Sequence, residues 1–147
     1  MPYTQIYYHI VLRTKHSEKT LPQENISELY RYIHGIIKNK KSYLYRINGM
    51  EDHIHICTSL HPSIALSDFI KDIKLATNYW MKSHKEFSQF KGWGEGYGGF
   101  TFRHKERDTV INYVKNQQEH HKKESFKGEI ARIFREEGIE LDERFFL

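Results

Sequence analysis

The stretch YLYRINGMEDHIHICTSL, residues 43–60, predicts a β-hairpin. Residues 43–47 and 53–60 are rich in β-branched and aromatic side chains, which is the composition of strands. Between them, residues 48–52 contain the Asn48–Gly49 pair, which favours a tight turn. We therefore expect two antiparallel strands that are joined by this turn.

The second of these strands places two histidines on one face. Side chains alternate between the faces of a strand, so His53 and His55 point one way and Ile54 and Ile56 point the other way, into the core. Two imidazoles on one face can act as a bidentate metal ligand. Taken alone, the pair fits equally well a strand that exposes two histidines to solvent.

The segments on either side of the hairpin complete an order of elements. The expected elements are a strand at residues 5–13, a helix that opens at Pro22, a helix that begins at Ser67 and Asp68, and a strand at residues 100–103. With the hairpin, the order is β-α-β-β-α-β. This order predicts an α+β protein of the ferredoxin-like plan, an antiparallel four-stranded sheet with two helices on one face.

Two further helices are expected after this unit, at about residues 107–123 and 128–137. They are additions to the ferredoxin-like plan. A chain of 147 residues is most simply one domain, so we assign residues 1–147 to a single unit. Within it, residues from about 126 to 147 form a C-terminal helix and tail.

Composition limits the class of protein. The net charge is +4 with neutral histidines and the pI is about 9.0, a mildly basic balance that permits nucleic-acid binding. The single cysteine, Cys57, excludes an internal disulfide, and its apolar neighbours predict a buried, unreactive thiol. No secretory segment follows Met1 and no apolar run approaches the length of a membrane span, so the cytoplasm is the expected compartment and no membrane partner is expected.

A second pair of chemically useful residues lies on the helix expected at 107–123. Tyr113 and Gln117 are four residues apart and so share one helix face. A tyrosine can act as a covalent nucleophile, and a glutamine carbonyl oxygen suits a hard cation. Taken alone, the pattern is more typical of a tyrosine that packs beside Val110 and Val114 and of a solvated glutamine.

Four stretches together resemble one known family. They are GMEDHIHI at residues 49–56, KDIK at 71–74, GYGGF at 96–100 and YVKNQQEHH at 113–121. In this order and spacing, the chain resembles the small single-tyrosine transposases of bacterial insertion sequences and their repeat-associated relatives. These belong to the class that is named for a His-hydrophobic-His (HUH) motif. The resemblance covers nearly the whole chain.

The resemblance implies a role for each of these residues. His53, His55 and Gln117 would be metal ligands, and Tyr113 would be the nucleophile. The implied enzyme cleaves and rejoins single-stranded DNA through a 5′-phosphotyrosine intermediate and leaves a free 3′-OH. The implied cation is Mg²⁺ or Mn²⁺. Magnesium usually prefers oxygen ligands and imidazole suits manganese, so this mixed ligand set does not decide between the two.

The resemblance also implies the partners. The substrate would be single-stranded DNA with hairpin ends, and the protein would be a homodimer in which Tyr113 of one subunit can complete the site of the other. Candidate phosphate contacts are basic residues after the first strand and on the second helix: Arg13, Lys15, Lys71, Lys74, Lys82 and Lys85. Each of them singly is more typical of a solvated surface. His120 and His121 are candidate ligands or proton shuttles, although such residues near a helix end are more often simply exposed.

Two other functions remain open at this point. One is a domesticated relative that nicks or processes hairpin repeats with the same active site, which only the surrounding genome would distinguish. The other is a non-catalytic module that binds single-stranded nucleic acid on a ferredoxin-like sheet. The presence of Tyr113, His53, His55 and Gln117 together argues against the second.

Overall fold

The computed structural model describes residues 2–142 and confirms the predicted α+β fold. Four antiparallel strands form one sheet in the order β2-β3-β1-β4. Their bounds are β1 Tyr7–Arg13, β2 Tyr43–Met50, β3 His53–Ser59 and β4 Gly98–Phe102. The last residues of the expected tail, 143–147, lie outside the described residues.

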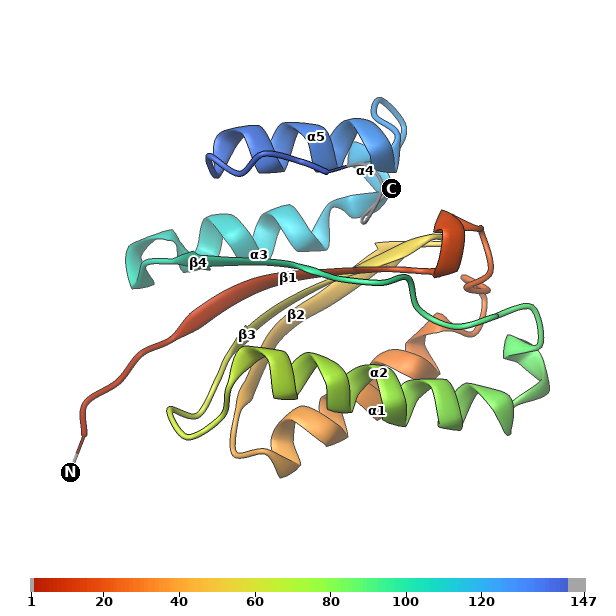
Figure 1. The fold of residues 1–147 in the computed structure, drawn as a ribbon, viewed down its shortest axis with the longest axis horizontal. Helices are drawn as coiled ribbons and strands as arrows, with labels where there is room; N and C mark the ends of the chain where they lie inside the picture. Colours follow the sequence, from red (N-terminus) through yellow and green to blue (C-terminus); the bar gives the residue numbers. More distant parts are fainter. Residues whose placement is uncertain (1, 143–147) are drawn as a thin grey trace.

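Helices cover both faces of the sheet (Figure 1). On one face lie α1 (Ile26–Asn39) and α2 (Leu66–Lys82), the two helices of the ferredoxin-like plan. On the other face lie α3 (Arg107–Lys115), α4 (Gln117–His120) and α5 (Phe126–Glu136). Short 3₁₀ turns occupy Lys15–Ser17, Lys85–Phe87 and His104–Glu106. None of the helices in residues 2–142 combines the length and the apolar character needed to cross a membrane.

The register of the central strands decides which side chains reach each face. In the β1–β3 ladder, Leu12 pairs with Ile54 and Ile10 pairs with Ile56. All four side chains are completely buried in the core that the sheet forms with α1 and α2. The predicted inward direction of Ile54 and Ile56 is therefore confirmed, and His53 and His55 point to the opposite face, as alternation requires.

A second apolar cluster holds the C-terminal helix on that opposite face. It contains Val11, Phe100, Phe126, Ile130, Ile133 and Phe134, and α5 supplies the last four. Burying each such side chain stabilises the fold by roughly 1.5–3 kcal/mol. The cap of α5 is also formed, because the Ser125 hydroxyl accepts a hydrogen bond from the Gly128 backbone N–H. The third layer of the protein is therefore a packed part of the fold.

The structure shifts the predicted boundaries of the first helix and of the hairpin. The helix expected from Pro22 begins only at Ile26. Strand β2 continues through Gly49 to Met50, so the predicted turn at residues 48–52 shrinks to two residues. Glycine permits this pairing, because a Cβ at position 49 would lie 2.2 Å from the carbonyl oxygen of His53.

The helix expected over residues 107–123 is broken rather than continuous. Asn116, with φ −97° and ψ 25°, ends α3, and α4 begins at the next residue. Tyr113 therefore lies near the end of one helix and Gln117 at the start of the next one. Both still face the sheet, because the Tyr113 ring contacts His55 and the Gln117 amide contacts His53.

Candidate active site

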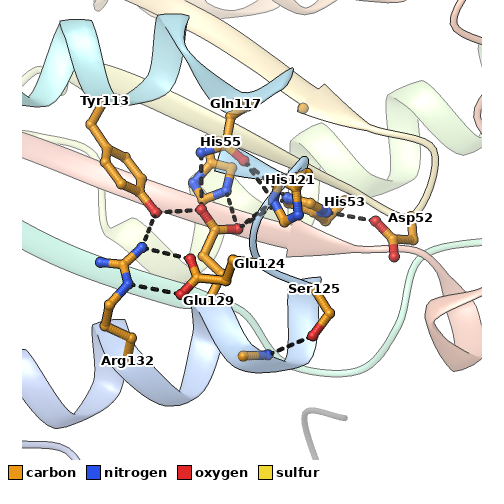
Figure 2. Close-up of polar contacts among 12 residues, drawn as sticks. Asp52, His53, His55, Tyr113, Gln117, His121, Glu124, Ser125, Glu129 and Arg132 are labelled. Atoms are coloured by element: carbon orange, nitrogen blue, oxygen red, sulfur yellow. Dashed lines mark hydrogen bonds and ion pairs between the residues drawn. The ribbon is translucent and has the colours of Figure 1, made fainter. Parts of the chain in front are cut away.

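His53 and His55 lie side by side on β3, beneath α3 and α5 (Figure 2). Both side chains are completely buried, and their ring centroids are 5.0 Å apart. His53 Nδ1 donates to an Asp52 carboxylate oxygen at 2.6 Å, and His55 Nδ1 lies 2.8 Å from His9 Nε2. These outer contacts fix the two rings so that both Nε2 atoms point into the site, an arrangement that is usual for metal-binding histidines.

Gln117 is also completely buried, and its amide is oriented by the site. Its Oε1 lies 3.1 Å from His53 Nε2 and 3.1 Å from His121 Nε2. Its Nε2 donates to Glu129 at 3.0 Å. The side chain therefore turns its carbonyl oxygen, the atom that can bind a cation, toward the histidines.

Glu129, which the sequence analysis did not single out, lies at the centre of the site (Figure 2). It comes from α5 and its carboxylate is completely buried. Its Oε1 lies 3.2 Å from the Nε2 atoms of both His53 and His55, and 2.9 Å from His121 Nε2. Ligand atoms of His53, His55 and Glu129 form a group that can hold a metal ion.

A signal for Glu129 was present in the sequence. Phe126, Ile130, Ile133 and Phe134 define the buried face of α5, and Glu129 shares that face. A carboxylate on an apolar helix face needs a partner, which makes such a residue a candidate for a site.

Tyr113 approaches the same carboxylate from α3. Its hydroxyl donates to Glu129 Oε2 and accepts a hydrogen bond from Arg132 at 2.8 Å. Arg132 is itself held by Glu124, through nitrogen–oxygen distances of 2.9 and 3.1 Å. The ring of Tyr113 stacks on His120, with centroids 4.5 Å apart. The phenolic oxygen is thus fixed between one carboxylate and one guanidinium.

The charges of the site are set by mutual contact. Burial by itself would raise the pKa of Glu129, but hydrogen bonds with His121, His53 and His55 hold that pKa well below its ordinary range. Burial would lower the pKa of His53, but hydrogen bonds to Asp52 and Glu129 outweigh it and raise that pKa to about 9. Glu129 is therefore an ionised carboxylate at the centre of a ring of imidazoles.

Burial dominates at the other side chains of this group. It lowers the pKa of His55 to about 4 and that of His9 to about 3. The pKa of Tyr113 is raised, first by burial and then by the adjacent charge of Glu129. His55 and His9 are neutral in the folded protein, and a neutral imidazole is the form that binds metals.

Comparison with known proteins identifies the family. The model of the family described as "Transposase IS200 like" matches residues 2–117. The chain belongs to the IS200-like transposase family. No curated protein sequence matches it.

Two solved structures share the fold of this transposase-family chain. One is a protein of Deinococcus radiodurans R1 described as a candidate transposase, with a TM-score of 0.62 and 22% identity over 79% of this chain and 93% of that one. The other is a REP-associated tyrosine transposase bound to a REP hairpin, with a TM-score of 0.62 and 13% identity over 82% of this chain and 72% of that one. At these identities the likeness supports the fold alone.

Two clefts give access to Tyr113 of this transposase-family chain. One, of about 450 Å³, is lined by Tyr113, Glu119, His120, Lys123, Glu124 and Arg132. The other, of about 290 Å³, has Tyr113 and Arg132 in its wall together with His9 and residues of α3 and α5. The tyrosine can therefore be reached from the surface, whereas His53, His55 and Glu129 are covered.

Of the basic residues that were predicted as phosphate contacts, those on the second helix lie away from Tyr113. Lys71 and Lys74 are on α2, on the opposite face of the sheet from Tyr113. Lys15 and Lys71 are exposed, but Arg13 is only 7% exposed. The Lys74 amine donates to the carbonyl oxygens of Gly94 and Gly96, at 2.9 and 2.7 Å.

The guanidinium of Arg13 contacts the same glycine-rich loop, residues 92–97, which precedes β4. It donates to the Glu95 carbonyl oxygen at 3.5 Å, and a Cβ at Gly94 would lie 2.3 Å from one of its nitrogens. Arg13 therefore anchors this loop to the end of β1, and Lys74 anchors it to α2.

Proposed function

We propose that this transposase-family chain cleaves and rejoins single-stranded DNA, with Tyr113 as the nucleophile and with His53, His55 and Gln117 as ligands of a divalent cation. The observation that carries the proposal is the convergence of these four side chains, from two parts of the sequence, on one buried carboxylate. A tyrosine nucleophile beside histidines that can bind a metal is an arrangement suited to phosphoryl transfer.

The chain's own residues supply groups that can assist the attack. The phenolic oxygen of Tyr113 would attack phosphorus while the bond from phosphorus to the 3′ oxygen breaks. The products are a 5′-phosphotyrosine and a free 3′-OH, and attack of a 3′-OH on the phosphotyrosine reverses the step. The phenolic proton already points at Glu129, and Arg132 donates to the same oxygen and so can stabilise its negative charge.

A bound cation would neutralise charge on the scissile phosphate. His53 and His55 offer imidazole nitrogen and Gln117 offers an amide oxygen, a set that accepts Mn²⁺ and also allows Mg²⁺. Both cations are therefore proposed.

The proposed substrate is single-stranded DNA that carries a hairpin near the cleavage site. A structural neighbour is bound to a REP hairpin, and the basic charge of this chain is suited to phosphates. Lys15 and Lys71 are exposed and are proposed to contact phosphate directly. Arg13 and Lys74 are proposed to assist by positioning the loop that they anchor.

A homodimer is the proposed assembly. Within the single chain, Tyr113 already contacts Glu129 and Arg132, next to the histidines of the same chain. For Tyr113 to serve the partner's site, α3 would have to leave these contacts. A site that is completed within one subunit needs no such rearrangement.

A cleavage assay on hairpin oligonucleotides tests the metal assignment. We expect cleavage with Mg²⁺ or Mn²⁺, none with EDTA, and a large loss for His55→Ala or Gln117→Ala. Binding of the oligonucleotide should survive in both variants, because phosphate contacts elsewhere supply most of the affinity. Full cleavage in EDTA would remove the cation from the mechanism.

A further inference from the structure

Two side chains of the site come from beyond the part of the sequence that the family model matches. The match ends at residue 117, whereas His121 follows α4 and Glu129 lies on α5. Both contact the ligands that the family resemblance assigns. His121 Nε2 is 3.1 Å from Gln117 Oε1, and Glu129 Oε1 is 3.2 Å from each of the Nε2 atoms of His53 and His55.

Five potential ligand atoms are therefore linked by short contacts. They are the Nε2 atoms of His53, His55 and His121, Oε1 of Gln117 and Oε1 of Glu129. The contacts among them range from 2.9 to 3.2 Å. In an octahedral shell with bonds of about 2.1 Å, neighbouring ligand atoms are about 3 Å apart. These five contacts match the spacing of neighbouring atoms in such a shell, and the ligand atoms of His53, His55 and Glu129 all lie within 4.8 Å of one another.

The two carboxylate oxygens of Glu129 make different contacts. Oε2 accepts hydrogen bonds from Tyr113 and Gln117, whereas Oε1 faces the three imidazoles. One oxygen can therefore bind a cation while the other keeps its contact with the nucleophile. A completely buried carboxylate needs a cation or several hydrogen-bond donors to compensate its charge. Tyr113 and Gln117 donate to Oε2, and a cation at Oε1 would compensate the rest.

We propose that Glu129 and His121 are also ligands of the cation. The segment after residue 117 then completes a metal centre that binds its cation in the absence of DNA. The inference rests on the proposed function and extends its ligand set. Three imidazoles, one carboxylate and one amide favour Mn²⁺ or a later first-row metal over Mg²⁺, because magnesium prefers oxygen ligands and retains several waters.

In a competing role, Glu129 would act as a plug: its carboxylate would occupy the position of the cation and would have to move away before a cation could bind. The two roles predict opposite effects of removing its charge. A ligand that is lost weakens the binding of the metal, whereas a plug that is lost strengthens it. A titration in the absence of DNA separates them.

The experiment titrates the metal-free full chain with MnCl₂ and follows free Mn²⁺ by electron paramagnetic resonance, with MgCl₂ as a competitor. We expect one tight Mn²⁺ site that Mg²⁺ displaces only in large excess. Glu129→Gln keeps the size of the side chain and should weaken Mn²⁺ binding at least about tenfold. This is the smaller loss of metal affinity that is typical when a residue supporting the ligands is replaced. His121→Ala should weaken it similarly.

The matched controls lie on α1, on the opposite face of the sheet. Glu28→Gln and His34→Ala change exposed side chains of the same types and should leave Mn²⁺ affinity unchanged. His121 is only partly buried, so His121→Ala remains informative if Glu129→Gln does not fold. Thermal unfolding of each variant shows which of them are folded.

Three results would overturn the inference: Mn²⁺ affinity that is unchanged or higher in folded Glu129→Gln or His121→Ala, no Mn²⁺ binding to the wild type without DNA, or a preference for Mg²⁺. The proposed function is tested separately. If His55→Ala abolishes metal-dependent cleavage while Glu129→Gln binds Mn²⁺ normally, the inference fails and the function stands. Absence of a covalent adduct at Tyr113 would instead remove the function.

Discussion

The hydroxyl of Tyr113 donates a hydrogen bond to Glu129, whose other carboxylate oxygen faces His53 and His55 in the same chain. One carboxylate thus links the proposed nucleophile to the proposed metal ligands. The link joins α3 and α5 to β3, a strand that is far from both helices in the sequence (Figure 2).

This link predicts that each subunit of a dimer completes its own site. Mixing Tyr113→Phe subunits with His53→Ala subunits should then give heterodimers without cleavage activity, because each site lacks one residue. The measurement is cleavage by heterodimers that have been purified with two different tags. Activity that reappears in the heterodimer would show that Tyr113 acts in the partner's site.

Arg132 is predicted to position the nucleophile. It donates to the Tyr113 hydroxyl at 2.8 Å, and hydrogen bonds to charged groups typically contribute about 1.5–3 kcal/mol. Arg132→Ala should lower the cleavage rate by about 10- to 100-fold at saturating DNA, with little change in the concentration of DNA that half-saturates the enzyme. Arg132→Lys should restore part of the rate.

The control for this prediction is Arg135→Ala, which removes an exposed arginine from the same helix. A weaker affinity for DNA at an unchanged maximal rate in Arg132→Ala would assign this arginine to substrate binding instead.

Gly49 is predicted to be necessary for the close pairing of β2 with the strand that carries the histidines. A Cβ there would lie 2.2 Å from the His53 carbonyl oxygen and 2.7 Å from Ile54 Cα, both backbone atoms. Gly49→Ala should lower the free energy of unfolding by about 1–3 kcal/mol or more, as overpacking does. Urea denaturation measures this.

Gly35→Ala is the matched substitution, because Gly35 is exposed on α1 with no neighbour within 4 Å of its added Cβ. It should raise the free energy of unfolding by roughly 0.5–1 kcal/mol, since alanine favours a helix interior. Equal effects of the two substitutions would be inconsistent with the pairing seen here.

Cys57 is predicted to be inert while the protein is folded. Its side chain is completely buried on β3, and burial raises the pKa of the thiol to about 12. A thiol reagent such as DTNB at pH 8 should react only at the rate of unfolding, and rapidly in urea. Stoichiometric reaction within seconds in native buffer would mean that the strand is open to solvent.

Local patterns predicted the sheet, and together with the family resemblance they predicted one half of the candidate site. Strand alternation placed His53 and His55 opposite Ile54 and Ile56, and this holds because the period of a strand is fixed by its backbone. Tyr113 and Gln117 were expected to share a helix face, and they reach one site although the helix breaks between them at Asn116.

The other half of the site depends on contacts between distant segments. Glu129 follows His55 by 74 residues, and no local pattern says that α5 packs on the face of the sheet where β3 presents its histidines. His9 was likewise not singled out, although alternation along β1 places it on the same face as Val11, whose partner in the ladder is His55. The burial of Arg13 depends on the glycine-rich loop that folds over it.

The central claim is that Tyr113 forms a covalent bond with the 5′ side of the broken DNA strand. Its most direct test is a hairpin oligonucleotide incubated with the protein and Mn²⁺ and resolved on a denaturing gel. With the label 3′ to the break, we predict a protein-linked band that is absent in Tyr113→Phe, a substitution that keeps the ring and so the fold. With the label 5′ to the break, we predict a shorter free strand that ends in a 3′-OH. A labelled adduct that persists in Tyr113→Phe, or the reverse labelling pattern, would contradict the account.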